Sequence, residues 1–61
     1  MGVTLQSARR GAGISQRDLA RRAGVSQSHL SRFEAGERPI SLVAYEHLQA
    51  ALAALLEADA A

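Results

Sequence analysis

The sequence predicts an all-α fold built as one small domain over residues 1–61. Three observations predict it. Ala, Leu and Arg, which favour helices, are the commonest residues. Apolar residues recur at steps of three and four, as on one face of a helix. Small polar residues and glycines interrupt this pattern where helices would begin and end. A chain of 61 residues supports one domain with a thin core.

The first predicted helix starts near Thr4. A threonine side chain can cap the free backbone N–H groups of a first turn, and Leu5 and Ala8 then fall at helical spacing. Two glycines, Gly11 and Gly13, weaken this helix and then end it. Glycine is unfavourable inside a helix and common just beyond its last turn.

Two short helices are predicted next, each beginning after a serine. Ser15 is followed three residues later by Asp18, which is similar to a capping box. Gly24 stands where a left-handed residue would end this helix. Ser26 is a good N-terminal cap for the third helix, which buries Leu30. The sequence therefore predicts two helices joined by a tight turn.

The last predicted helix is capped by Ser41 and runs to about Glu57. Pro39 keeps the preceding segment out of helical geometry. No glycine or proline interrupts the helix, so four helices are expected, with five as the alternative. Its apolar residues recur at helical spacing and are expected to close the core. They are Leu42, Tyr45, Leu48 and Leu52.

The second and third helices have the spacing of a helix-turn-helix. Ala20 is small where the two helices must cross closely, and Gly24 makes the turn. Leu19, Val25 and Leu30 face a shared core. In such a unit the second of the two helices lies in the major groove of DNA.

The segment Gly13–Pro39 resembles the phage repressor and Cro-type (xenobiotic-response-element) helix-turn-helix family. The turn glycine, the small alanine, the glutamine that begins the second helix and the Glu-x-Gly after the third carry the resemblance. Leu5, Arg9 and the Leu-rich last helix also match, so that it covers about residues 4–52. The resemblance implies a compact lambda-repressor-like fold. It also implies a transcriptional regulator that binds double-stranded DNA, a repressor or controller protein in the cytoplasm of a bacterial or phage-type system.

Four residues of the third helix are candidates for contacts with bases. Gln27 and Ser28 begin that helix, and glutamine can bond adenine through two hydrogen bonds. Ser31 and Arg32 share the outward face one turn further on. Ser31 fits a solvated position as well as a base contact. Arg32 suits either a guanine or a phosphate.

Three further residues are candidates for contacts with the DNA phosphates. The resemblance implies that Gln16 bonds a phosphate and braces Gln27. A helix N-terminus already attracts anions, which favours this role. Arg17 follows Gln16 in the chain, and Arg38 lies in the loop before the last helix. Both arginines are expected to clamp the backbone.

The resemblance also implies a structural ion pair between Arg9 and Glu34. Such a pair would be partly buried between the first and third helices. Removing one partner of a buried pair costs about 3–5 kcal/mol, because the other charge is left uncompensated. We therefore interpret Arg9 as a structural residue rather than a DNA contact.

Charge is divided unequally along the chain. Residues 1–38 hold all seven arginines and a net charge of +4, whereas residues 39–61 hold no basic residue and a net charge of −3. Such asymmetry between the two halves of a chain indicates a polyanionic partner for the basic half. Double-stranded DNA is the partner that fits the predicted fold.

The last helix also predicts a homodimer, because it is apolar on more than one side. Leu55 and Leu56 are expected to lie beyond the reach of so short a bundle, and with Leu52 they are the predicted dimer interface. A dimer would bind a palindromic operator with its two recognition helices about 34–36 Å apart. The alternative is the DNA-binding fragment of a longer regulator, whose other part covers these leucines.

Nothing in the sequence indicates an enzyme, a cofactor, a metal site or a small-molecule substrate. Cysteine and lysine are absent, and His29 and His47 have no carboxylate placed to complete a metal site. No run of about 20 apolar residues predicts a membrane helix, and a soluble protein is expected. The competing function is a protein-interaction module of the antitoxin type, in which DNA binding is secondary.

Overall fold

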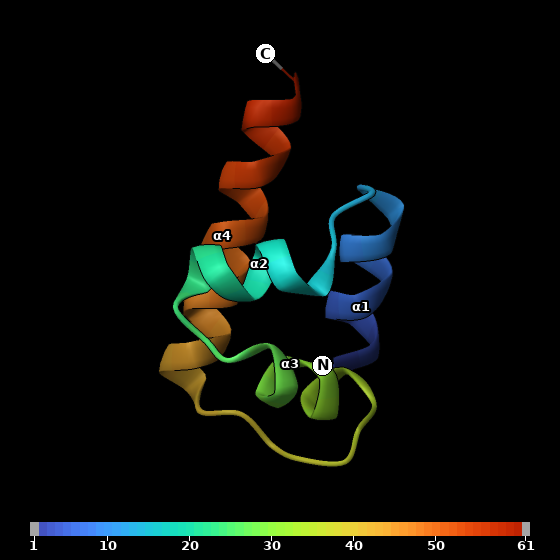
Figure 1. The fold of residues 1–61 in the computed structure, drawn as a ribbon, viewed down its shortest axis with the longest axis vertical. Helices are drawn as coiled ribbons and strands as arrows, with labels where there is room; N and C mark the ends of the chain where they lie inside the picture. Colours follow the sequence, from blue (N-terminus) through green and yellow to red (C-terminus); the bar gives the residue numbers. More distant parts are fainter. Residues whose placement is uncertain (1, 61) are drawn as a thin grey trace.

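The computed structural model describes residues 2–60, with the side chains of residues 4–58, and this part of the chain is entirely helical (Figure 1). The helices are α1 (Gly2–Gly11), α2 (Gln16–Ala23), α3 (Gln27–Glu34) and α4 (Leu42–Ala60). The predicted all-α class is therefore confirmed. Within residues 2–60 the number of helices is four, not five.

Three helices begin at the predicted serine caps. In each case the side-chain oxygen accepts a hydrogen bond of 3.1 Å from the backbone N–H three residues later. The capping residues are Ser15, Ser26 and Ser41. Each bond satisfies one of the N–H groups that a helix leaves free in its first turn, which explains why α2, α3 and α4 start where they do.

The turn between α2 and α3 depends on Gly24. This residue has φ 72° and ψ 28°, a left-handed conformation that side chains with a Cβ rarely adopt. The next N–H, from Val25, then donates to the Ala20 carbonyl over 3.0 Å and closes the end of α2. The predicted terminator role of Gly24 is confirmed. The turn is short enough to hold α2 and α3 in contact.

α2 lies at the centre of the arrangement. It packs against α3 and α4, while α1 packs against α3. In Figure 1 the C-terminal part of α4 extends past the other helices. Phe33 and Tyr45 join α3 to α4 edge to face, with ring centroids 6.0 Å apart. All four helices contribute to the core, which is formed by Leu5, Leu19, Ala20, Leu30, Phe33, Leu48, Ala51 and Leu52.

The start of α1 differs from the prediction. The helix begins at Gly2, so Thr4 lies inside its first turn and is not its cap. Nothing at this end prevents an earlier start, because proline is absent and threonine costs at most about 0.7 kcal/mol inside a helix. Leu5 is buried as expected.

The buried face of α4 also differs from the prediction. A helix turns by about 100° per residue, so Leu42 points about 120° away from Leu48, and 69% of Leu42 is exposed. Leu55 lies seven residues after Leu48 and therefore on the same face. It packs against the core, although the sequence analysis placed it beyond the bundle. Leu52 is also a core residue, with only 5% exposed, and is not available to a second chain.

The end of α4 was predicted near Glu57, and the helix continues to Ala60. Alanine has the highest helix propensity of all residues, and no glycine or proline stops the last turns. Leu56 is exposed in this projecting part, in keeping with its predicted position outside the core.

Candidate nucleic-acid interface

The two faces of α3 differ completely in burial. Leu30, Phe33 and Glu34 are buried against the other helices. The opposite face is exposed along its whole length and is formed by Gln27, Ser28, Ser31 and Arg32. These four residues recur at helical spacing, so their side chains share one outward surface. The structure thus brings together the four residues that the sequence analysis proposed for contacts with bases.

The candidate phosphate ligands lie on two neighbouring segments. Gln16 and Arg17 begin α2, and Arg38 lies in the loop between α3 and α4. Both arginines are exposed, whereas Gln16 is half-buried. His29 links α3 to that loop, because its Nε2 lies 3.5 Å from the Pro39 carbonyl oxygen. The start of α2 and the loop therefore both adjoin α3.

A buried ion pair holds α1 against α3. The Arg9 guanidinium donates from Nε to Glu34 Oε2 over 2.8 Å and from Nη2 to Glu34 Oε1 over 2.9 Å. Its third nitrogen, Nη1, donates to the Ile14 carbonyl over 2.8 Å, in the connection that leads to α2. The side chains are 7% and 0% exposed. Two parallel bonds of this kind fix both the distance and the plane of the two groups.

The Glu34 carboxylate accepts one more hydrogen bond, from Gln16 Nε2 to Oε1 over 2.9 Å. Burial raises the pKa of Glu34, but the hydrogen bonds from Arg9 and Gln16, with the charge of Arg9 and of Arg10, leave the pKa below its ordinary value. Glu34 is therefore ionised at neutral pH. An ionised carboxylate only accepts hydrogen bonds, so the amide of Gln16 must present its nitrogen.

Sequence reasoning missed this contact. The resemblance implied that Gln16 bonds a phosphate and braces Gln27, and the bond from its amide nitrogen to Glu34 was not part of that prediction. Residues 16 and 34 belong to different helices, and no helical spacing rule connects positions 18 apart. One signal did indicate it. A bidentate arginine uses two of the acceptor positions of a carboxylate, so a buried glutamate paired in this way calls for a further hydrogen-bond donor.

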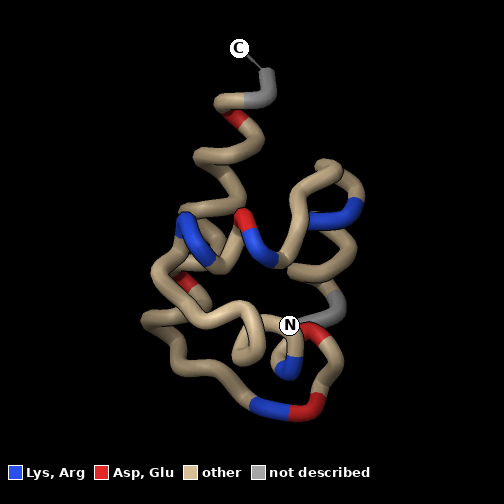
Figure 2. Tube along the Cα trace, viewed as in Figure 1, with Lys and Arg blue, Asp and Glu red and all other residues tan. Residues whose placement is uncertain are grey.

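Positive charge is confined to the first three helices and the loop that follows them. Figure 2 shows arginines on α1, α2, α3 and the following loop, and none along α4. Every arginine apart from Arg9 is exposed. The exposed arginines are therefore spread over α1, α2, α3 and the loop before α4, and the residues of α4 add none.

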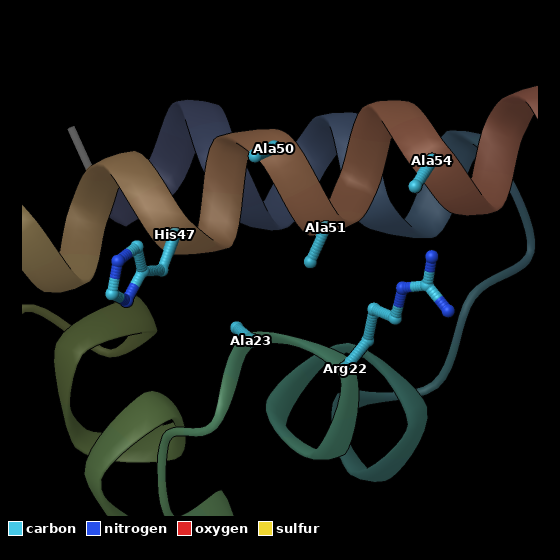
Figure 3. Close-up of a pocket in the computed structure, with 6 residues that line it drawn as sticks. All are labelled: Arg22, Ala23, His47, Ala50, Ala51 and Ala54. Atoms are coloured by element: carbon cyan, nitrogen blue, oxygen red, sulfur yellow. The ribbon is translucent and has the colours of Figure 1, made fainter.

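A hollow of about 290 Å³ lies on another side of the molecule, between α2 and α4. Figure 3 shows Arg22 and His47 at its two ends, with alanines of both helices between them.

Among residues 4–58 no group of His, Asp or Glu side chains gathers as a metal site would require. None of the helices described is long and apolar enough to cross a membrane.

The fold and this surface define a class of protein. Two short helices joined by a three-residue turn, with the second exposing a polar face, form a helix-turn-helix DNA-binding unit. The comparison with protein families agrees: residues 1–61 match the helix-turn-helix domain family, and the chain belongs to that family. Comparisons with curated proteins and with solved structures found no match.

Proposed function

We propose that the protein is a sequence-specific, dimeric transcriptional regulator of the phage repressor and Cro type, with α3 in the major groove. The observation that carries this proposal is the outward face of α3. It exposes four polar side chains in a row, while the opposite face of the same helix is buried in the core. Because these four side chains are exposed on one face, they are available to contact bases.

The side chains on α3 have the chemistry for that purpose. Gln27 at the first position can bond adenine N6 and N7 together, and Arg32 can bond guanine O6 and N7. Ser28 and Ser31 can donate to or accept from several bases. A good bidentate contact discriminates against a wrong base by about 1–3 kcal/mol. The pattern therefore favours a defined operator over general affinity for DNA.

Phosphate contacts are proposed for Gln16, Arg17 and Arg38. They flank α3 on the start of α2 and on the loop after it. If each subunit neutralises three or four phosphates, the logarithm of the affinity of a dimer should fall against the logarithm of the salt concentration with a slope of about −5 to −7.

The dimer is proposed to form through the projecting end of α4. Leu56 is 44% exposed there, and Leu55 is only half-buried. Together the two leucines leave an apolar surface that a second copy of the chain would cover in the proposed dimer. A monomeric mass by analytical ultracentrifugation at tens of micromolar would contradict the dimer. Leu56→Glu should convert a dimer to monomers, with Glu46→Gln on α4 as the control.

The test of the function is selection from random duplexes of about 25 base pairs at about 150 mM salt, conditions under which specific and non-specific binding differ strongly. Enrichment of a palindrome with half-sites about 10 base pairs apart supports a dimeric regulator. A single enriched half-site supports a monomer. Salt-sensitive binding without enrichment would favour the protein-interaction module over the regulator.

A matched pair of variants tests the role of α3 in the same experiment. Gln27→Ala removes an exposed glutamine from the proposed reading face, and Gln49→Ala removes an exposed glutamine from α4. The first should relax the preference at one position of the half-site. The second should leave the selected sequence unchanged. Equal effects of the two changes would contradict the placement of α3 in the groove.

A further inference from the structure

We propose that Glu34 is a positioning residue for DNA binding: its buried carboxylate holds the Gln16 amide in the orientation that contacts the DNA backbone. This inference rests on the proposed function and adds a residue to it. Glu34 itself is 2% exposed and cannot touch DNA. It would act only through Gln16, whose amide is bonded to it.

Three hydrogen bonds hold the Glu34 carboxylate. Glu34 Oε2 accepts from Arg9 Nε, and Oε1 accepts from both Arg9 Nη2 and Gln16 Nε2, at 2.8–2.9 Å. The two bonds from Arg9 already fix the plane of the carboxylate. The third bond therefore extends from a rigid acceptor, and it transfers that rigidity to the glutamine amide.

The same bond determines which atoms of Gln16 remain available. An amide has two N–H donors and one carbonyl acceptor, and one donor is occupied by Glu34. The second N–H is left for an anion such as a phosphate oxygen. Because Glu34 only accepts, a flipped amide would place two oxygens together, so the orientation is determined by charge.

Exposure increases from the buried ion pair towards the start of α2, as positioning of a surface side chain by a buried one requires. Arg9 and Glu34 are buried, Gln16 is half-buried, and its neighbour Arg17 is exposed. The hydrogen bonds thus run from the core between α1 and α3 to the surface at the start of α2. Gln16 takes no part in the two bonds between Arg9 and Glu34, and its half-buried amide lies at the end of the network nearest the surface.

Holding the amide before DNA arrives strengthens binding for a general reason. A free glutamine side chain samples several rotamers, and fixing it on contact with a partner costs conformational entropy. A glutamine already fixed by the protein avoids that cost. The effect should appear in the affinity for DNA as a coupling between residues 16 and 34.

The test is a double-mutant cycle on the full chain, with the duplex enriched by the parent protein as the probe. Gln16→Ala, Glu34→Gln and the double variant are compared at low temperature, with circular dichroism verifying that each is folded. Glu34→Gln should weaken binding about tenfold in the parent and less than about twofold when Gln16 is absent. If Glu34→Gln weakens DNA binding by the same factor in the parent and in Gln16→Ala, the inference is wrong.

A control cycle separates positioning from general loss of structure. Arg17 is exposed and adjoins Gln16 in the chain, and it makes no ion pair with Glu34 among the contacts described. The effects of Arg17→Ala and Glu34→Gln should therefore add. Coupling as large as that of Gln16 would mean that Glu34→Gln disturbs the whole start of α2, and would also overturn the inference.

A variant that leaves Glu34 intact covers the case in which Glu34→Gln does not fold. Gln16→Asn keeps the amide but is one methylene shorter, so it cannot span from Glu34 to the backbone. It should bind as weakly as Gln16→Ala, and parental affinity would contradict the inference. Absence of sequence-specific binding by the parent protein would instead refute the proposed function, and the inference with it.

Discussion

The helices α3 and α4 present opposite kinds of outward surface. α3 has eight residues and exposes amide, hydroxyl and guanidinium groups along one face. α4 has 19 residues, contains no arginine, and its large exposed apolar side chains are Leu42, Val43 and Leu56. Polar and basic groups suit a nucleic acid, whereas apolar groups suit another protein surface. The outward surfaces of the two helices therefore differ in chemistry, as the two partners proposed for them require.

Their buried faces differ as well. On α3 the buried Glu34 is connected by hydrogen bonds to Arg9 in the core and to Gln16 at the edge of the proposed interface. On α4 the buried Leu48 and Leu52 belong to the hydrophobic core. Core changes in α3 should therefore affect both stability and DNA binding, while core changes in α4 should affect stability alone.

The largest expected effect is that of Glu34→Ala. It leaves the buried Arg9 without its partner, and the free energy of unfolding should fall by about 3–5 kcal/mol. A domain of this size has roughly 3–9 kcal/mol in total, so the variant should be largely unfolded at moderate temperature. Thermal denaturation followed by circular dichroism measures the effect. Equal melting temperatures for the variant and the parent would contradict the role of the pair.

A substitution in the core of α4 tests the expectation that this helix affects stability but not DNA binding. Leu48 is fully buried, and Leu48→Ala should cost about 2–5 kcal/mol of stability. At low temperature, where the variant is still folded, its affinity for DNA should equal that of the parent. Leu42→Ala is the control, because an exposed leucine outside the proposed contacts should change stability by no more than about 0.5 kcal/mol. Reduced DNA affinity of the folded Leu48→Ala variant would mean that the core of α4 also affects DNA binding.

The positions of the helices followed from the sequence because their ends depend on local chemistry. A serine oxygen reaches an N–H three residues away, and Gly24 adopts its left-handed conformation without help from other parts of the chain. The buried face of α4 was predicted less well. Steps of three and four both fit a helix, so the spacing alone did not exclude Leu42 from the core or include Leu55.

The candidate interface, like the core, was predictable only in part. The exposed face of α3 follows from the periodicity that buries Leu30 and Phe33. The contact between Gln16 and Glu34 does not, because it joins two helices whose relative placement depends on the whole core. Sequence patterns describe which face of a helix is buried, but not which polar groups meet across a helix crossing.

Acid should destabilise the folded protein, because it protonates the buried carboxylate of Glu34. The pKa of Glu34 is lowered in the folded protein from an ordinary value of 4.5. Its contribution to stability is therefore complete above pH 4.5 and is lost as the pH falls through the folded-state pKa. Melting temperatures measured from pH 6 downwards should decline less steeply in Glu34→Gln than in the parent. Glu57→Gln, an exposed carboxylate of α4, should keep the parental slope.

The smallest expected effect compares two arginines of α2. Arg17 lies in the first turn of α2, next to Gln16, whereas Arg22 points into the hollow beside α4, toward Ala54 (Figure 3). Arg17→Ala should reduce the salt dependence of DNA affinity by a slope of about one per subunit, because one phosphate contact is lost. Arg22→Ala should leave the slope unchanged, since its side chain faces the alanines of α4. Equal losses would mean that DNA contacts both ends of α2.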